Sequence, residues 1–323
     1  MRSALSVLCA AALAPAAPNA HAEEAWPARE VKMIAPFPAG SGATDTIARL
    51  MAERLRVAWN QPVVVQNLPG AAGSVGIGRL ARSPADGYTL ATSGDAAIVV
   101  NVSLYKSLAY DPVKDLVPIA LIGRVPNLLV VHPANGPKTL PDLVATAKAR
   151  PGAFSFTSNG YGTSQHMAIE QLKRQAGIEV VHAPKPGTAV QDVAGGHVDA
   201  AFMNMPVALA QVKAGTLRAL AQTGRVRSPM AKDVPTVAEL GLPGFEAVAW
   251  AGVFAPAGTP DAVVRRIAAD VAKALEDPAF RGRLTELGVE VAEPGSPEQF
   301  AAFIRGEIPR VAELIRASGI RLE

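Results

Sequence analysis

Three stretches of the chain combine glycine with small hydroxyl residues immediately before a predicted helix. They lie near Pro38, Ser158 and Gly187. The first N–H groups of a helix have no partner within the helix, and the positive end of its dipole lies there. Such a helix start binds anions through main-chain amides. The first chemistry that the sequence suggests is therefore capture of a negatively charged molecule.

The stretch from Val31 to Asp45 is the clearest of the three. It predicts a short apolar strand, then a turn, then a helix. Gly40 and Gly42 let a ligand approach the backbone closely. Thr44 is a plausible N-cap, and Asp45 is expected in the first helical turn. There Asp45 either stabilises its own helix by ~0.3–1 kcal/mol or faces an ammonium or hydroxyl group of the ligand, and the first role is preferred.

A dinucleotide site is an alternative interpretation of the first turn. The run from Gly40 begins as Gly-x-Gly-x-x, but Asp45 stands where the third glycine belongs. The second strand ends in Gln66 and Asn67, where an acid that binds ribose is expected. Simple anion binding is therefore favoured.

Nucleophilic catalysis is the alternative at the second turn, with Ser158 or Ser164 as nucleophile and His166 as base. The stretch does not follow the Gly-x-Ser-x-Gly pattern. His166 is expected in the first helical turn, either donating to an anion or serving as a structural histidine. The other histidines show no metal-ligand spacing, and no paired carboxylates are visible. The sequence favours binding over turnover, with no cofactor.

The elements around these turns predict two α/β lobes. Apolar strands beginning at Val31, Pro62 and Tyr88 alternate with helices, which predicts a parallel sheet with ligands at its carboxyl edge. The pattern then restarts. The predicted strands of the second half are Asn127–His132, Phe154–Thr157, Glu179–His182, Val198–Met203 and Leu217–Thr223.

The C-terminal part is predicted to return to the first lobe. A strand over Ala249–Phe254 precedes helices over Asp261–Glu276, Pro278–Leu287 and Glu298–Ala317. The expected division is residues 23–125 plus 250–323 for the first lobe and 126–249 for the second.

The N-terminal segment predicts an exported protein, and composition argues against nucleic-acid-binding and membrane-spanning proteins. Residues 1–22 resemble a secretory signal that is cleaved after Ala22. The chain's only cysteine, Cys9, lies within it, so the mature protein has no disulfide. The formal net charge is +3, and aromatic residues make up 5%. These values argue against nucleic-acid binding. The best candidate for a membrane span, Leu116–Val131, is interrupted by Arg124 and two prolines.

Several motifs closely resemble the Bug proteins, the solute-binding receptors of tripartite tricarboxylate transporters. The resemblance covers essentially the whole mature chain. It rests on the motifs PFPAGSGATDTIAR from Pro36, SPADGYTL from Ser83, LYKSLAYDPVKDLVPI from Leu104, SNGYGTSQHMA from Ser158, GGHVDAAF from Gly195 and DVPTVAELGLPGFEAVAWAGVFAPAGTP from Asp233.

The resemblance implies a periplasmic-binding-protein-like (Venus flytrap) fold that closes on a small organic carboxylate. It implies a periplasmic, non-enzymatic receptor that serves membrane permease subunits or a sensor kinase, and we expect a monomer. The turns carried over are Phe37–Thr44, Ser158–Thr163 and Pro186–Thr188. An exported hydrolase-like enzyme that uses Ser164 and His166 is the alternative function.

Candidate ligand-binding residues follow from these turns and from neighbouring strand ends and aromatic side chains. They are Phe37, Pro38, Ala39, Gly40, Ser41, Gly42, Thr44, Asp45, Ser93, Ser158, Asn159, Gly160, Gly162, Thr163, His166, Pro186, Gly187, Thr188, Asn204 and Trp250.

Overall fold

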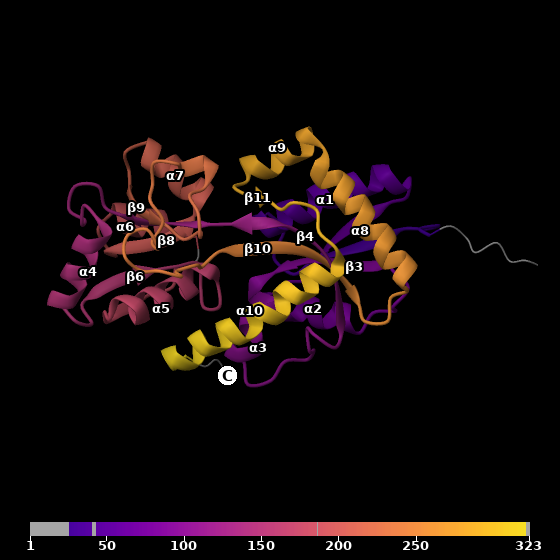
Figure 1. Cartoon of the computed structure of the whole chain (residues 1–323), viewed down its shortest axis with the longest axis horizontal. Helices are drawn as coiled ribbons and strands as arrows, with labels where there is room; N and C mark the ends of the chain where they lie inside the picture. The colour runs from indigo at the N-terminus through magenta and orange to yellow at the C-terminus, as the bar shows by residue number, and fades with distance from the viewer. Residues whose placement is uncertain (1–25, 41–42, 186, 321–323) are drawn as a thin grey trace, which may run out of the picture.

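The structure is a computed structural model that describes residues 26–40, 43–185 and 187–320. The predicted signal and its cleavage site lie outside the described residues, as do Ser41, Gly42 and Pro186. Two lobes lie side by side along the long axis, joined by extended chain (Figure 1). The predicted two-lobed α/β fold is confirmed.

The first lobe is built on a six-stranded sheet with strand order β11-β4-β10-β3-β1-β2. The strands β1, β2 and β3 are parallel, as predicted, whereas β10 runs antiparallel to β3 and β4. The last strand, β11, pairs antiparallel with β4. The bounds are β1 Val31–Ala35, β2 Val63–Asn67, β3 Thr89–Gly94, β4 Leu116–Val125, β10 Ala249–Pro256 and β11 Glu290–Val291.

The second lobe is built on a five-stranded sheet with strand order β7-β6-β8-β5-β9. Strand β6 is parallel to β7 and β8, and β5 is antiparallel to β8 and β9. The carboxyl ends of β6, β7 and β8 therefore meet at one edge of the sheet. The bounds are β5 Asn127–Val131, β6 Phe154–Thr157, β7 Val180–His182, β8 Ala200–Asn204 and β9 Arg218–Gln222.

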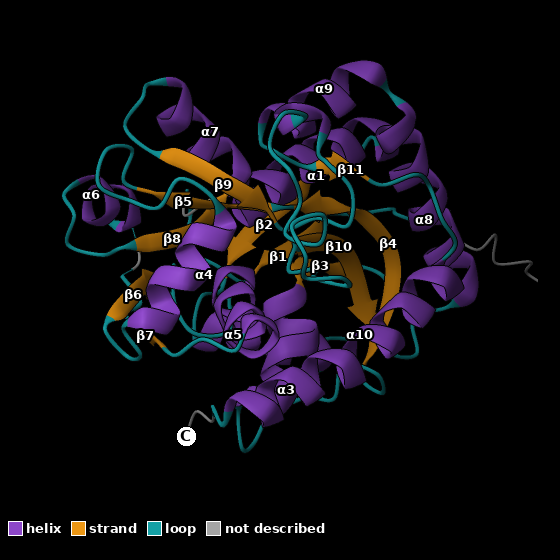
Figure 2. Cartoon of the chain, turned by 60° about the vertical axis from the view of Figure 1, so that its left-hand side comes forward, coloured by secondary structure: helices purple, strands orange, loops and turns teal. Residues whose placement is uncertain are grey.

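Helices flank both sheets (Figure 2). Helix α8 packs against α1 and β4, and α10 packs against β4, α3 and α5. The helices are α1 Ala43–Trp59, α2 Ser74–Ala81, α3 Asn101–Leu104, α4 Leu140–Ala149, α5 Ser164–Ala176, α6 Ala189–Ala194, α7 Met205–Lys213, α8 Asp261–Glu276, α9 Pro278–Glu286 and α10 Pro297–Ser318. Short helical turns are η1 Ala71–Gly73, the π-helical η2 Ala96–Val100 and η3 Pro229–Ala231. None of the helices in these described ranges is long and apolar enough to cross a membrane.

The last helix, α10, begins with a capping box. The Ser296 hydroxyl accepts the Gln299 N–H, and the Gln299 side chain accepts the Ser296 N–H. Pro309 lies in its interior, where it has no N–H to donate to the preceding turn. Beyond Pro309, the side chains Leu314 and Ile315 share a buried apolar cluster with Met167 of α5. This helix therefore contacts both lobes.

Strand β4 was not predicted, although the apolar run that contains it was noted. The chain is extended from Leu116 to Val125, passes Pro126, and continues as β5 in the other sheet. Pro118 is accommodated where the pairing with β10 is irregular, beside Phe254. A proline fits at such a break because one ladder hydrogen bond is already missing.

The close approach of β3 and β10 yields a stability prediction. A Cβ atom on Gly94 would lie 2.0 Å from the Trp250 carbonyl oxygen, so Gly94→Ala forces the two strands apart. We expect a loss of about 2 kcal/mol or more in the free energy of unfolding, measured by urea denaturation. As the control, Gly282 is exposed in α9 with open space around it. Gly282→Ala is expected to stabilise the protein by about 0.5–1 kcal/mol. Equal effects of the two substitutions would contradict this packing.

Candidate ligand-binding site

The turn between β1 and α1 is organised by the Asp45 carboxylate. It accepts hydrogen bonds from the Gly40 N–H (2.8 Å), from Asn67 Nδ2 (2.6 Å) and from Arg49 Nε (3.0 Å). Burial alone would raise the pKa of Asp45, but these hydrogen bonds outweigh it and the pKa is lowered. The side chain is only 2% exposed. Asp45 therefore holds the turn against β2 instead of facing solvent.

Two expectations for this turn change as a result. Helix α1 begins at Ala43, so Asp45 lies in its first turn as predicted, but Thr44 is already inside the helix and is not the N-cap. The N–H of Gly40 is bound to Asp45. What the turn offers to a ligand is the exposed surface of Pro38, Ala39 and Gly40, beside the half-buried Phe37.

The second turn, between β6 and α5, is held by its own hydroxyl groups. Thr163 Oγ1 donates to the Gly160 carbonyl (2.8 Å) and accepts the His166 N–H as the N-cap of α5. The Ser158 hydroxyl accepts the Gly160 N–H (3.1 Å). Gly160 and Gly162 have φ of 131° and 77°, which side-chain-bearing residues rarely adopt. The glycines expected from the sequence are therefore required by the shape of this turn, on which Asn159 is exposed.

A pair of imidazoles, one buried and one half-buried, backs the second turn. The rings of His166 and His182 stack with centroids 4.6 Å apart, and the Tyr161 ring meets both edge-on. His166 Nδ1 accepts the Gly162 N–H, and His182 Nε2 lies 2.8 Å from the Ser158 hydroxyl. Burial, and then the mutual repulsion of positive charge, lowers the pKa of His166 to about 3, and burial lowers that of His182 to about 4. Both rings are neutral at pH 7 and position the turn from behind.

The third turn is tied to the second. The Lys185 N–H donates to the Ser158 carbonyl (3.0 Å). The Thr188 hydroxyl and the Lys185 ammonium both bind Asp192 within the same segment. Gly187 is exposed with open space around it. The lysine charge is thus already compensated, and the free surface of this turn is backbone.

Asn127 connects the site to the strands that cross between the lobes. Its amide donates to Ser164 Oγ (3.1 Å) and to the Ala247 carbonyl (3.0 Å) and accepts from Gln165 Nε2 (3.1 Å). Gln165 also donates to the Asn204 side chain, at the carboxyl end of β8. Asn204 is therefore joined to the start of α5, and its contact with a ligand stays a prediction. The sequence analysis did not single out Asn127, whose importance comes from partners 37 to 120 positions away.

Ser93 and Trp250 are buried in the first lobe. Ser93 is a fully buried residue of β3, paired with Gly252 of β10. Trp250 is 4% exposed and packs edge-on against Phe300 and Phe303 of α10. Their surroundings are those of the sheet and its aromatic packing.

Asp95 and Asn101 were missed by the sequence analysis and lie where the lobes meet. Asp95 lines a cavity of ≈ 20 Å³, room for about one water molecule, together with Ser164 of α5. Burial raises the pKa of Asp95 to about 7. Asn101 faces Gly162, whose Cβ position is 3.5 Å from the Asn101 Oδ1 atom. A carboxyl beside a strand end was the only signal available for Asp95.

The geometry does not support the hydrolase alternative. Ser164 Oγ accepts a hydrogen bond from Asn127, whereas His166 Nδ1 is bound to the Gly162 N–H. Among the described residues, no hydrogen bond joins Ser164 to His166, so the serine has no base. No group of acidic, histidine or cysteine residues within this part of the chain is arranged to hold a metal ion.

Comparison with known proteins decides the family. Residues 47–320 match the model of the tripartite tricarboxylate transporter family receptor. The chain belongs to this receptor family. It is 40% identical to protein BugT of Bordetella pertussis over 305 residues, which cover 93% of this chain and 92% of BugT. Membership confirms the resemblance and makes the chain a solute-binding receptor, so the enzyme alternative is wrong.

Solved structures of relatives agree with the fold. The structure of Rpa4515 from R. palustris with adipate superposes with a TM-score of 0.82 at 34% identity, covering 92% of this chain and 99% of that one. MatC from Rhodopseudomonas palustris with bound malate gives a TM-score of 0.79 at 33% identity, covering 90% and 100%.

The Asp45 contacts predict that the protein loses stability when this carboxylate is removed from the turn between β1 and α1. Asp45→Ala leaves the Gly40 N–H without its acceptor and leaves the Asn67 amide with the Phe37 carbonyl alone. We expect a loss of about 1–3 kcal/mol in the free energy of unfolding, measured by urea denaturation at pH 7. Asp261→Ala is the matched control, because Asp261 also lies in the first turn of its helix and pairs with the arginine four residues on, but this exposed pair contributes at most about 1 kcal/mol. An Asp45→Ala protein as stable as the control would contradict the organising role.

The histidine pair predicts acid sensitivity. Both histidines are neutral when folded but take up protons near pH 6.5 when unfolded, so stability is full above about pH 6.5 and falls as the pH drops toward 4. For His166 alone the loss at pH 5 is about 2 kcal/mol. His166→Asn retains an acceptor for the Gly162 N–H and is expected to flatten the profile, measured by denaturation at several pH values. An unchanged slope between pH 7 and 5 would refute this assignment, and His132→Gln, outside the pair, serves as the control.

Proposed function

We propose that this protein is a periplasmic receptor that captures a small organic carboxylate between its lobes and delivers it to a tripartite tricarboxylate transporter. The observation that carries the proposal is the start of α5, capped by Thr163 and placed at the junction of the lobes. Its first N–H groups lack partners within the helix and form an anion site. The relatives bound to adipate and malate support a carboxylate ligand.

The proposed binding surface consists mainly of backbone. The exposed parts of the three turns are Pro38–Gly40, Asn159–Tyr161 and Gly187–Thr188. The charged side chains nearest to them, Asp45 and Lys185, are bound to partners of their own. The N–H groups of Gly40, Gly160 and Thr188 already donate within these turns and fix their shape, so the anion is bound by the other amides of the three segments. Turns fixed in this way need no rearrangement when an anion arrives, which limits the entropy lost on binding.

One turn alone would bind too weakly. A micromolar site requires about 8 kcal/mol, whereas a helix terminus supplies up to about 2 kcal/mol and each charge-assisted hydrogen bond about 1.5–3 kcal/mol. Association itself costs at least about 4 kcal/mol. The ligand must therefore be held by both lobes together.

Contacts between the lobes support closure around the ligand. Gly162 of the second lobe lies against Asn101 and Leu104 of the first. Arg174 of α5 forms an ion pair of 3.0 Å with Glu313 of α10. A ligand that contacts both lobes shifts the population toward the closed state, which gives a membrane partner a signal to recognise.

The remaining parts of the proposal concern export and assembly. The expected signal is residues 1–22, cleaved after Ala22, and the expected lobes are 23–125 plus 250–323 and 126–249. The partners are the membrane permease subunits or a sensor kinase, and the receptor acts as a monomer.

Two glycines of the second lobe provide the test. Gly162→Ala and Gly152→Ala both place a side chain at positive φ, with φ of 77° and 71°. Only Gly162 faces the first lobe, where the new Cβ would lie 3.1 Å from Leu104, whereas Gly152 has open space around it. We expect calorimetry with malate, adipate and citrate to give micromolar binding of at least one acid. Affinity should fall at least tenfold in Gly162→Ala and stay within twofold in Gly152→Ala.

The protein for this experiment is unfolded, dialysed and refolded, so that no copurified ligand masks the site. Absence of heat with every acid in folded protein would overturn carboxylate binding. Equal affinities of the two glycine variants would overturn closure at Gly162.

A further inference from the structure

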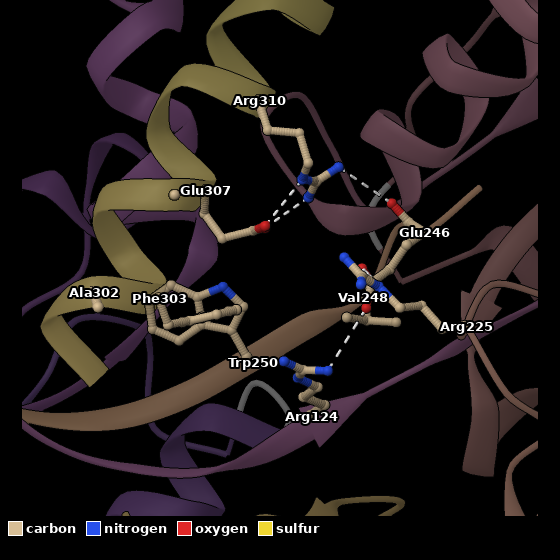
Figure 3. A pocket seen from close by; sticks show the side chains of 10 residues that line it. Arg124, Arg225, Glu246, Val248, Trp250, Ala302, Phe303, Glu307 and Arg310 are labelled. Carbon is tan, nitrogen blue, oxygen red and sulfur yellow. Dashed lines mark hydrogen bonds and ion pairs between the residues drawn. The ribbon is translucent and has the colours of Figure 1, made fainter. Parts of the chain in front are cut away.

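A second cavity, separate from the three turns, lies where the chain crosses between the lobes. Its volume is ≈ 420 Å³, within the size range of small-molecule sites. Figure 3 shows its walls converging from α10, from β10 and the segment before it, and from the end of β4. The lining residues are Arg124, Arg225, Glu246, Val248, Trp250, Ala302, Phe303, Gly306, Glu307 and Arg310.

The charges in this cavity do not balance. Three arginines face two glutamates (Figure 3). Arg310 binds Glu307 through two nitrogens, and Arg225 binds Glu246 through Nε. The lining residues therefore carry a net positive charge, and Glu290, a further carboxylate near Arg124, lies outside the lining.

Arg124 is the most weakly paired of the three arginines that line the cavity. Its nearest carboxylate oxygen, on Glu246, is 3.7 Å away, beyond hydrogen-bond distance. Its guanidinium instead lies over the Phe303 ring, 5.3 Å from the centroid. The planar donor set of an arginine in this position matches a carboxylate that would bind it through both oxygens.

The wall beside Arg124 is apolar and includes a buried indole donor. The rings of Trp250 and Phe303 meet edge-on, and Val248 lies next to them in the lining. The Trp250 indole Nε1 is buried and has no acceptor among the described residues. A buried N–H of this kind costs free energy unless a ligand or water accepts from it.

From these features we infer that this cavity between the lobes is a second binding site, which takes a small aromatic carboxylate. The carboxylate binds Arg124 and neutralises the excess charge, and the ring packs against Trp250 and Phe303. One negative charge suffices, which favours a monocarboxylate over the dicarboxylates bound by the two relatives.

The position of the pocket links this second ligand to the opening of the lobes. Arg124 is the penultimate residue of β4 before the chain leaves the first sheet, and Arg225 follows β9 of the second sheet. Arg310 comes from α10 and donates to the Glu246 carbonyl on the returning segment. A ligand among these groups binds best at one angle between the lobes, so it changes the affinity of the cleft for its own ligand. By the same linkage, the cleft ligand changes the affinity of this second site by the same factor.

Titration with benzoate tests this assignment. We expect calorimetry to detect benzoate binding to the wild-type protein with adipate present in excess. Arg124→Gln should weaken benzoate binding at least tenfold. Arg227→Gln is the matched control, because it removes the same charge at a position two residues from Arg225. The Arg227 side chain pairs with Glu239 and does not line the cavity. It should change benzoate affinity less than twofold.

An NMR measurement locates the ligand independently. The chain has three tryptophans, and the Trp250→Phe variant identifies the Trp250 indole resonance by its loss. Benzoate should shift this resonance and leave those of Trp26 and Trp59 in place. The proposal is overturned if the Trp250 resonance does not move, if Arg124→Gln binds benzoate as the wild type does, or if adipate displaces benzoate competitively. The first two of these outcomes follow benzoate directly and do not depend on whether the cleft binds adipate. Only the third uses adipate.

Discussion

The arrangement of both lobes depends on the hydrogen bonds made by the Asn127 side chain. It lies at the point where the chain leaves the first sheet, and its amide reaches the returning segment at Ala247 and the start of α5 at Ser164. Its backbone N–H donates to Thr223 Oγ1 (2.9 Å), which adds the end of β9 to the same point. One fully buried amide therefore fixes two crossings of the hinge and the helix start proposed to hold the ligand. An unsatisfied amide in such a place is costly, so these partners are held together.

Much of the fold was predictable because the strands and helices are amphipathic in the ordinary way. Helix α8 begins and ends where the sequence predicted, and the three parallel strands of the first sheet follow from their alternation with helices. Strand β4 escaped prediction because Pro118 and Pro126 argue against a strand, and only its irregular pairing with β10 makes room for the first of them. The π-helical turn Ala96–Val100 has no local signal in the sequence.

The turns of the proposed site were predictable from the sequence, whereas the contacts that hold these turns in place were not. Glycines and hydroxyl residues before a helix mark Ser158–Thr163, and Thr163 is indeed the cap. The role of Asp45 was foreseen only in part, because its partner Asn67 lies 22 positions away on the next strand. The stacking of His166 on His182 could not be foreseen, because it depends on β7 lying beside β6. Local sequence specifies where a turn will be, and pairing between distant strands specifies what surrounds it.

Helix α10 has a weak point at Pro309. As a straight rod of 22 residues it would be about 33 Å long. The missing N–H at Pro309 weakens the helix one turn before Glu313, which is paired with the second lobe. The segment before this joint lies on the first sheet, and the segment after it packs against α5. The far end of the helix touches both lobes, because Leu314 lies in one apolar cluster with Val100 of the first lobe and Met167 of the second. A change in the angle between the lobes must therefore be taken up by these contacts or by bending of the helix at Pro309.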